Sequence, residues 1–496
     1  MKTKLKKEGI TRRDFITKSA AATAGFTILP SYVVSGLGHR VPSDRLNIAG
    51  IGIGGVGNRA LRQVSETENI VALCDVDWRY AKPVFDQYPN ARRYWDWRKM
   101  YDEMGNDIDA VIIATSDHTH AITAAHAMTL GMHVFLEKPL THTVYESRLL
   151  TRLADEYKVA TQMGNQGASE DGVNQIMEWI AEGLIGEVRK VEAFTDRPIW
   201  PQGMNVPEPP QWVPDTLDWD LFIGPAKMRP YHELYTPWNF RGWWDFGTGA
   251  LGDMAPHVLH PVFKGLDLGY PIKVQGSSTL LLQDAAPQAQ KVRIVFPARE
   301  SARLGRLPEV EVYWYDGGIE PLKPDGWPAG RDMNDAGGGV LFHGSEDTLV
   351  CGCYGRRPWL LSGKMPTGIV QTERRVHTNH TMDWVRACKE SPDNRTEAKS
   401  AFKESGPFNE MVVMGVLAVR LQELHKELEW DGEKMEFSNI DDRETLSIVI
   451  RDGFVIEDGH PSFTRDTTDP INAAEFARKL VKTEYREGWD LPDMPA

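Results

Sequence analysis

The 496-residue sequence predicts an α/β protein of more than one domain, the first of them built on a parallel sheet. The length favours two to four domains, because a single hydrophobic core seldom serves so long a chain. Between residues 45 and 165, short apolar runs alternate with helical patterns, which is typical of parallel sheets. After residue 165 the alternation ends, which indicates a second domain of different construction.

Residues 1–40 are predicted to be a targeting signal and linker. The run Thr11-Arg12-Arg13-Asp14-Phe15-Ile16 follows several lysines and precedes a weakly apolar stretch, a pattern that resembles a twin-arginine export signal. We therefore expect a periplasmic protein. A basic start with no targeting role is the alternative. The apolar stretch is too short to span a bilayer, so we expect no membrane insertion after signal removal.

Composition narrows the function classes. The hydrophobic fraction of 41% and charged fraction of 25% are those of a globular protein, and the formal charge of -14 argues against a nucleic-acid partner. Four cysteines are too few for a disulfide framework. Because Cys351 and Cys353 lack zinc-knuckle spacing, we expect no metal there. The 16 tryptophans are compatible with core filling and with stacking on sugar rings.

A glycine-rich motif follows the first predicted strand, residues 45–51. The motif is Gly52-Ile53-Gly54-Gly55-Val56-Gly57, of the form G-x-G-x-x-G, and a helical pattern follows it. The first glycine permits a tight turn, the second lets the backbone approach a pyrophosphate, and the third lets helix and strand pack closely. This strand, motif and helix predict a Rossmann dinucleotide-binding domain, with the anion at the helix N-terminus.

The second predicted strand indicates which dinucleotide binds. It covers residues 70–74 and ends at Asp75, 23 residues after Gly52. A carboxylate at this position accepts hydrogen bonds from a ribose 2′-hydroxyl and repels a 2′-phosphate. The sequence therefore favours NAD, and the nearby Arg79 leaves NADP as the less favoured alternative.

Two further strands, residues 110–114 and 133–136, place polar loops at the same edge of the sheet. The first is followed by the loop 115–120 and the second by Glu137-Lys138-Pro139. Ligands of such sheets bind outside the carboxyl ends of the strands, so we expect both loops to face the cofactor. With the glycine motif and Asp75, these segments have the order and spacing of the Gfo/Idh/MocA family of oxidoreductases, which the chain resembles over roughly residues 45–435.

The resemblance implies the fold of the rest of the chain. A Rossmann NAD-binding domain is expected at 41–165. A C-terminal α/β domain with a large, mostly antiparallel open sheet is expected at 166–435, serving substrate binding and oligomerisation as a homodimer or homotetramer. Its last helix, over residues 408–425, is expected to pack back on the first domain, and residues 436–496 are expected to form an extension.

The resemblance also implies the catalytic residues. The lysine of Glu-Lys-Pro reaches the reacting centre in the family, which puts Lys138 there, and a cis Lys138–Pro139 peptide is expected. The segment 249–257 resembles the family's Gly-Gly-x-x-x-Asp-x-Gly-x-His signature and supplies Asp253 and His257. It departs from the signature at Pro256, where glycine is common, and His260 stands where the family often has an acid.

Roles follow from the chemistry of these groups. His257 has the pKa to take a hydroxyl proton, Lys138 is expected to stabilise the alkoxide, and Asp253 to position substrate and base. Two other interpretations stay open for Asp253, His257 and His260, at spacings of four and three residues. They could ligate a metal, or the histidines could be structural; we expect no metal.

The remaining site residues fall into two groups. Residues at the carboxyl edge of the first sheet are expected to bind the cofactor: Gly52, Gly54, Gly55, Val56, Gly57, Asp75, Thr115, His120, Glu137, Lys138 and Asn165. Residues in or near the irregular, Trp-rich stretch 200–245 are expected to contact substrate, with loop packing as the alternative: Arg197, Trp200, Arg241, Trp243 and His260.

The expected function is hydride transfer between a secondary alcohol of a sugar or glycoside and tightly bound NAD. Because the periplasm offers no free NAD pool, an exported enzyme needs a second substrate or a closed redox cycle. The closed cycle gives the alternative of a glycosidase that oxidises, eliminates and re-reduces, with His257, Tyr231 or Tyr235 as elimination base. A non-catalytic carbohydrate-binding protein is the alternative from another class.

Overall fold

The computed structural model describes residues 44–495, so the predicted export signal in residues 1–40 lies outside the described residues. The first sheet has six parallel strands in the order β3-β2-β1-β4-β5-β6, which confirms the Rossmann prediction. Its strands are β1 (Asn47–Ile51), β2 (Asn69–Cys74), β3 (Arg92–Tyr94), β4 (Ala110–Ile113), β5 (His133–Leu136) and β6 (Thr161–Met163).

Helices cover this sheet in the alternation that the sequence predicts. They are α2 (Val56–Ser65), α3 (Trp78–Gln87), α4 (Trp97–Met104), α5 (Asp117–Thr129) and α6 (Val144–Glu156). The strand order reverses direction between β1 and β4, and a cleft for ligands forms at such a point. The glycine motif after β1 and the loops after β4 and β5 meet at this edge.

The second sheet has nine strands in the order β15-β14-β13-β7-β12-β9-β8-β16-β17. Only the β7–β12 pair is parallel among them, which confirms the expected, mostly antiparallel sheet. The strands are β7 (Val188–Thr195), β8 (Lys273–Ser278), β9 (Gln290–Phe296), β12 (Val310–Tyr315), β13 (Gly338–Gly344), β14 (Thr348–Gly352), β15 (Trp359–Leu360), β16 (Leu428–Asp431) and β17 (Glu436–Phe437).

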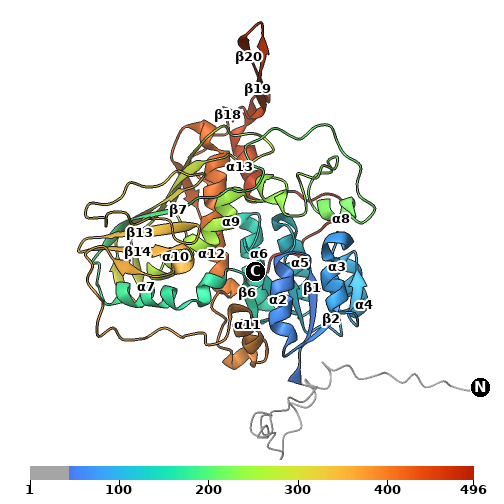
Figure 1. Cartoon of the computed structure of the whole chain (residues 1–496), viewed down its shortest axis with the longest axis horizontal. Coiled ribbons are helices and arrows are strands. Elements are labelled where there is room, and N and C mark those ends of the chain that lie inside the picture. The colour runs from blue at the N-terminus through green and yellow to red at the C-terminus, as the bar shows by residue number, and fades with distance from the viewer. Residues whose placement is uncertain (1–43, 496) are drawn as a thin grey trace, which may run out of the picture. The chain divides into compact units, whose positions relative to one another are not determined.

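Helix α12 (Phe402–Arg420) joins the two sheets. It contacts β8 and β9 of the second sheet and also α6 and β6 beside the first, so the helix expected over 408–425 begins and ends a few residues earlier. It is buried nearly all round, as a helix between two layers must be. Beside it lies α9 (Gly249–Val258), which contacts α10 (His260–Gly265), and α10 in turn contacts α7 (Asp171–Ala181) (Figure 1).

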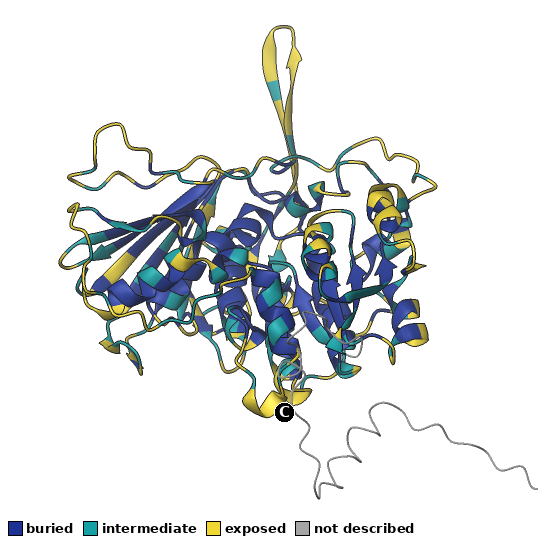
Figure 2. Ribbon diagram, turned by 60° about the horizontal axis from the view of Figure 1, so that its bottom comes forward, coloured by how far each residue is buried: buried dark blue, intermediate teal, exposed yellow. Residues whose placement is uncertain are grey.

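The C-terminal extension has two parts. The hairpin β19 (Val449–Glu457) and β20 (His460–Thr467) projects from the body and is exposed along its length (Figure 2). Helix α13 (Ala473–Val481) packs on α12, and the segment after it reaches the Rossmann domain, where Arg98 lies 4.1 Å over the ring of Trp489. No helix within residues 44–495 combines the length and apolar character needed to cross a bilayer.

The remaining helices and strands are short. They are α8 (Trp219–Ile223), α11 (His380–Cys388), β10 (Arg299–Ser301), β11 (Gly305–Leu307), β18 (Thr445–Leu446), β21 (Ile471–Asn472) and the 3-10 turns η3 (Gln166–Ser169), η4 (Asn239–Gly242), η5 (Cys353–Gly355), η6 (Pro392–Asn394) and η7 (Gln422–Leu424).

Candidate functional site

The glycine motif forms the floor of a cavity at the carboxyl edge of the first sheet. Gly52 has φ of +73°, and a Cβ on it would lie 2.5 Å from the Ala114 carbonyl oxygen. A Cβ on Gly57 would lie 2.4 Å from the Gly52 carbonyl oxygen, where α2 approaches β1. Both positions therefore require glycine. One wall of the cavity therefore consists of backbone without side chains, which lets a pyrophosphate approach closely.

Asp75 fastens this loop to the end of β2. Its Oδ2 accepts hydrogen bonds from the N–H groups of Ile53 (2.8 Å) and Gly54 (3.1 Å), and its Oδ1 accepts one from the Asp77 N–H (2.9 Å). Burial raises the pKa of Asp75 to about 6. Because a carboxylate oxygen can accept two hydrogen bonds, Oδ1 keeps room for a ribose hydroxyl.

The ring of Tyr80 covers the same loop, a feature that the sequence analysis missed. A Cβ on Gly54 would meet the Tyr80 ring at 2.3 Å, so the glycine also makes room for this side chain. Tyr80 is part of α3, whose N-terminus is capped by Asp77. The bare glycine backbone, the carboxylate at the end of β2 and the aromatic wall together fit a dinucleotide.

Most of the residues expected to bind cofactor line this cavity. These are Gly52, Gly54, Gly55, Val56, Asp75, Thr115, Glu137 and Lys138. Two lie elsewhere. His120 is fully buried behind the wall, with Nδ1 2.8 Å from the Pro139 carbonyl oxygen and Nε2 3.1 Å from that of Thr115, so it braces the two loops. Asn165 is also fully buried, and its side-chain amide donates to the Pro256 carbonyl oxygen at 3.4 Å.

Helix α9 brings the second half of the site to the first. Its N-terminus is held by Asp117 of α5, whose Oδ2 accepts hydrogen bonds from the Thr248 hydroxyl (2.8 Å) and N–H (3.2 Å). The same anchoring places Asp253, one turn further on, against the loop after β5. Two segments 115 residues apart in the sequence thus meet at one point.

The centre of that contact is the Asp253 carboxylate between two cations. Its Oδ1 lies 2.6 Å from Lys138 Nζ and 2.7 Å from Arg241 Nε, and Lys138 Nζ also donates to the Asp253 carbonyl oxygen at 3.0 Å. Burial raises the pKa of Asp253, but the charges of Lys138 and Arg241 outweigh it and hold the pKa well below its usual value. The Lys138–Pro139 peptide is cis, which confirms that expectation.

His257 lies one helical turn after Asp253 and is buried. Burial and the charge of Lys138 lower its pKa to about 3. The imidazole is therefore neutral at physiological pH. Its Nδ1 has no hydrogen-bond partner within residues 44–495, and its ring lies 4.7 Å from that of Tyr354. A neutral imidazole beside a lysine ammonium is able to accept a proton from a hydroxyl.

Tyr354 is the tyrosine that the structure places at the site, and the sequence analysis missed it. It has φ of +66° within η5, which is uncommon for a bulky residue. The two tyrosines considered as elimination bases are in a separate aromatic cluster around Trp219: Tyr231 lies 5.2 Å and Tyr235 6.2 Å from its ring. The expectation that Tyr231 or Tyr235 serves as the elimination base is therefore corrected.

Three of the residues expected to contact substrate have other surroundings. Trp243 is fully buried and donates through Nε1 to the Leu234 carbonyl oxygen, so it belongs to the core. His260 begins a new helix and lies 3.1 Å from Glu404, beneath α12. Arg197 forms an ion pair with its neighbour Asp196. The expectations for Trp243 and His260 are corrected on these grounds.

The other two lie near the catalytic cluster. Arg241 contacts Asp253 directly, and its guanidinium lies over the Trp238 ring at 5.0 Å. Trp200 meets Trp238 edge to face at 5.6 Å and donates to Gln202. In the described part of the chain, no three His, Cys, Asp or Glu side chains gather as a metal site.

Glu137 gives the cavity a pH dependence. Burial raises its pKa to about 7, against the opposing charge of Lys138, and Arg241 and Arg59 oppose it further. The carboxyl is therefore neutral below about pH 7 and charged above it. Oxidised NAD carries one more positive charge than the reduced form, so we expect its dissociation constant to fall by up to about tenfold from pH 6 to pH 8.

Calorimetric titration of nicotinamide-free protein with NAD and NADH at both pH values measures this. The Glu137→Gln variant is the matched control and should show the same pH profile for both forms, because the remaining titration of Asp75 affects NAD and NADH alike. Equal slopes for NAD and NADH in the unmodified protein would contradict the role given to Glu137.

Two family models match the chain. Residues 46–165 match the oxidoreductase family GFO_IDH_MocA, NAD-binding Rossmann fold, and residues 171–299 match its C-terminal alpha/beta domain. The two matches together span about half of the chain. They cover the glycine motif, the loop with Lys138 and the helix with Asp253 and His257.

Curated relatives match over the first part of the chain. The inositol 2-dehydrogenase of Salmonella typhimurium is 30% identical over 142 residues, which is 28% of this chain and 42% of that protein. The alpha-N-acetylgalactosaminidase of Shewanella oneidensis is 29% identical over 211 residues, 37% of this chain and 45% of that protein. The chain thus spans less than half the length of these relatives.

A solved structure extends the likeness to 78% of the chain. The WlbA dehydrogenase from Bordetella pertussis, in complex with NADH and UDP-GlcNAcA, superposes with a TM-score of 0.51 over 78% of this chain and 99% of that one. At 14% identity this likeness shows a shared fold.

Proposed function

The chain belongs to the Gfo/Idh/MocA family of NAD-binding oxidoreductases, and we propose that it transfers hydride between a secondary alcohol of a sugar or glycoside and tightly bound NAD. The observation that carries the proposal is the cluster at the mouth of the glycine-lined cavity. There the ammonium of Lys138 is fixed by Asp253, and the neutral imidazole of His257 stands beside it.

Lys138 and His257 have different roles in the proposed reaction. Bound NAD supplies the hydride acceptor and donor. Lys138 Nζ has three N–H groups, and Asp253 takes two of them, through its carbonyl oxygen and Oδ1. The third is available to the substrate oxygen and stabilises negative charge as it develops there. His257 is neutral at physiological pH and takes the hydroxyl proton, while the Lys138 ammonium stabilises the alkoxide that remains.

Asp253 and Arg241 act as positioning groups. Asp253 Oδ1 accepts hydrogen bonds from both Lys138 Nζ and Arg241 Nε. A shift of the carboxylate towards one cation would lengthen its hydrogen bond to the other. The shared carboxylate fixes the direction of the Lys138 side chain. A preorganised cation costs no rearrangement when the alkoxide forms.

A glycosidase with a closed redox cycle is the second candidate. Elimination after oxidation needs a group that takes the proton beside the new ketone and another that protonates the leaving oxygen. Tyr354, 4.7 Å from His257 between ring centres, supplies a second proton-carrying group at the site. The relatives include one protein named as an alpha-N-acetylgalactosaminidase.

Two further proposals rest on the sequence. The twin-arginine pattern at residues 11–16 supports export to the periplasm, with the cofactor already bound. The family resemblance supports a homodimer or homotetramer. The third function considered, a non-catalytic carbohydrate-binding protein, is disfavoured by the retention of Lys138, Asp253 and His257 as one cluster.

One assay tests the proposed function. Purified protein is offered a panel of free sugars and chromogenic glycosides with no added NAD, and both nicotinamide absorbance and aglycone release are followed. Reduction of bound nicotinamide by a sugar is the expected result. Aglycone release without net reduction would select the glycosidase. Neither signal, from protein shown to hold nicotinamide, would contradict both.

A further inference from the structure

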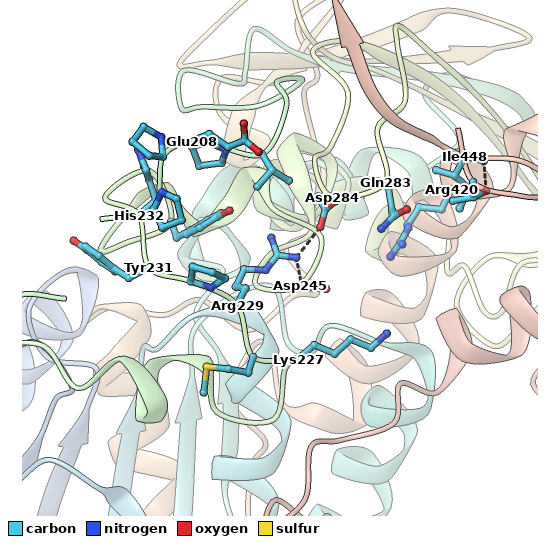
Figure 3. Close-up of a pocket in the computed structure, with 18 of the residues that line it drawn as sticks. Glu208, Lys227, Arg229, Tyr231, His232, Asp245, Gln283, Asp284, Arg420 and Ile448 are labelled. Carbon is cyan, nitrogen blue, oxygen red and sulfur yellow. Dashed lines mark hydrogen bonds and ion pairs between the residues drawn. The ribbon is translucent and has the colours of Figure 1, made fainter. Parts of the chain in front are cut away.

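A second cavity, of about 1100 Å³, shares the loop 228–247 with the cofactor cavity but is lined by other residues of that loop (Figure 3 shows the second cavity). The first cavity is lined by Thr236, Pro237, Trp238, Phe240 and Arg241, whereas the second is lined by Arg229 to His232, Tyr235 and Asp245. The remaining walls are the loop 206–210, the end of α12 and the base of the β19–β20 hairpin. None of the groups assigned to hydride transfer lines it.

The floor of this cavity holds two carboxylates fixed by one guanidinium. Arg229 Nη2 lies 2.7 Å from Asp284 Oδ1 and also contacts Asp245 Oδ2 (Figure 3). The guanidinium itself is held 5.5 Å from the ring centres of both Tyr235 and Phe246. Each carboxylate therefore has a fixed direction, and its second oxygen has no hydrogen-bond donor within residues 44–495.

The wall opposite Tyr231 and His232 carries a cation with no partner (Figure 3). The side chain of Arg420 makes no hydrogen bond or ion pair in the described chain, and it lies over the rings of Trp244 (5.1 Å) and Phe476 (5.5 Å). Burial lowers its pKa to about 10, so the group stays charged at physiological pH. A partly buried guanidinium without an acceptor is costly unless a ligand supplies one.

We propose that this cavity is a second saccharide-binding site that takes a neutral sugar unit. It offers fixed acceptors at Asp245 and Asp284 and free donors at Arg420, and a sugar hydroxyl can satisfy both kinds because it donates and accepts. The aromatic and proline walls suit the apolar face of a sugar ring. The site does not depend on the proposed redox function, because binding needs neither nicotinamide nor turnover.

Charge excludes the other ligand classes. Three cationic side chains line the cavity and balance three carboxylates, so it has no surplus charge to offer a strong anion or cation: Lys227, Arg229 and Arg420 against Glu208, Asp245 and Asp284. A phosphate or a uronate at Arg420 would come near two carboxylates, and like charges in a partly buried site repel. A metal ion at the carboxylates would come near Arg229, which already pairs with both.

Binding of the full-length protein to an array of neutral oligosaccharides, with uronates and sulfated glycans as comparators, tests the proposal. Hits are measured by calorimetry and by saturation-transfer NMR. We expect a neutral glycan to bind, and Arg420→Met or Asp284→Asn to weaken its binding at least about tenfold, the usual cost of a lost charge-assisted hydrogen bond. Arg306→Met, on an exposed arginine of β11, is the matched control and should bind normally.

Lys138→Ala separates the two sites, because it alters the catalytic cluster and leaves the second cavity intact. Glycan binding that survives Lys138→Ala and fails in Arg420→Met supports the proposal. The reverse pattern would place the glycan at the catalytic cluster and overturn it. Binding of acidic glycans alone, or of no glycan, would also overturn it. Circular dichroism confirms that each variant is folded.

Discussion

Replacing Lys138 with alanine is expected to lower turnover by about 100-fold or more while leaving the fold intact, and His257→Ala is expected to do the same. Lys138 supplies the only ammonium that Asp253 holds at the cavity mouth in the described chain, so its loss removes the charge that stabilises the alkoxide. His257→Ala removes the neutral base. The rate of nicotinamide reduction in a single turnover measures both.

Lys403→Ala is the matched control, because this lysine is exposed on α12 and should leave the rate unchanged. Nicotinamide content must be measured in every variant, so that lost chemistry is distinguished from lost cofactor. A Lys138→Ala protein that keeps its nicotinamide and turns over at the normal rate would refute the assignment. A loss confined to substrate affinity would make Lys138 a binding group instead.

The sequence predicts the first domain well because its signals are local. The glycine motif lies between β1 and α2, where a Cβ on Gly52 or Gly57 would meet backbone atoms and one on Gly54 would meet the Tyr80 ring. The strands at 70–74, 110–114 and 133–136 are found within a residue of those positions. The cluster of Lys138, Asp253 and His257 follows from the family resemblance, since nothing local links two segments 115 residues apart.

The misplaced residues share a physical reason. His260 lies seven residues after Asp253 and would share its face on one continuous helix. However, α9 ends at Val258 and α10 begins at His260, which sends its ring towards Glu404. Trp243 has a side chain suited to sugar stacking, but burial is set by packing between distant segments. Tyr354 reaches His257 from the end of β14, and no spacing in the sequence indicates this contact.

The other large effect concerns the cofactor itself. Protein purified without added nucleotide is expected to carry about one nicotinamide per chain, because the export that we propose requires an enzyme that keeps its cofactor through each cycle. Gly52→Val should carry none. Its Cβ would stand 2.5 Å from the Ala114 carbonyl oxygen in a backbone conformation with φ of +73°, so the loop cannot keep its shape.

Denaturing the protein and assaying the supernatant for NAD and NADH measures the content. Gly269→Ala is the matched control, since a Cβ there meets no atom within 4 Å. The result also decides between modes of action. Retained nicotinamide must be returned to its starting oxidation state by a second sugar or by the same one, which favours sugar pairs and glycosides as substrates.

Nicotinamide that binds only when added would indicate an ordinary dehydrogenase and remove the main reason to expect a closed cycle. Protein that neither retains nor binds it would contradict the dinucleotide site, whatever the second cavity binds.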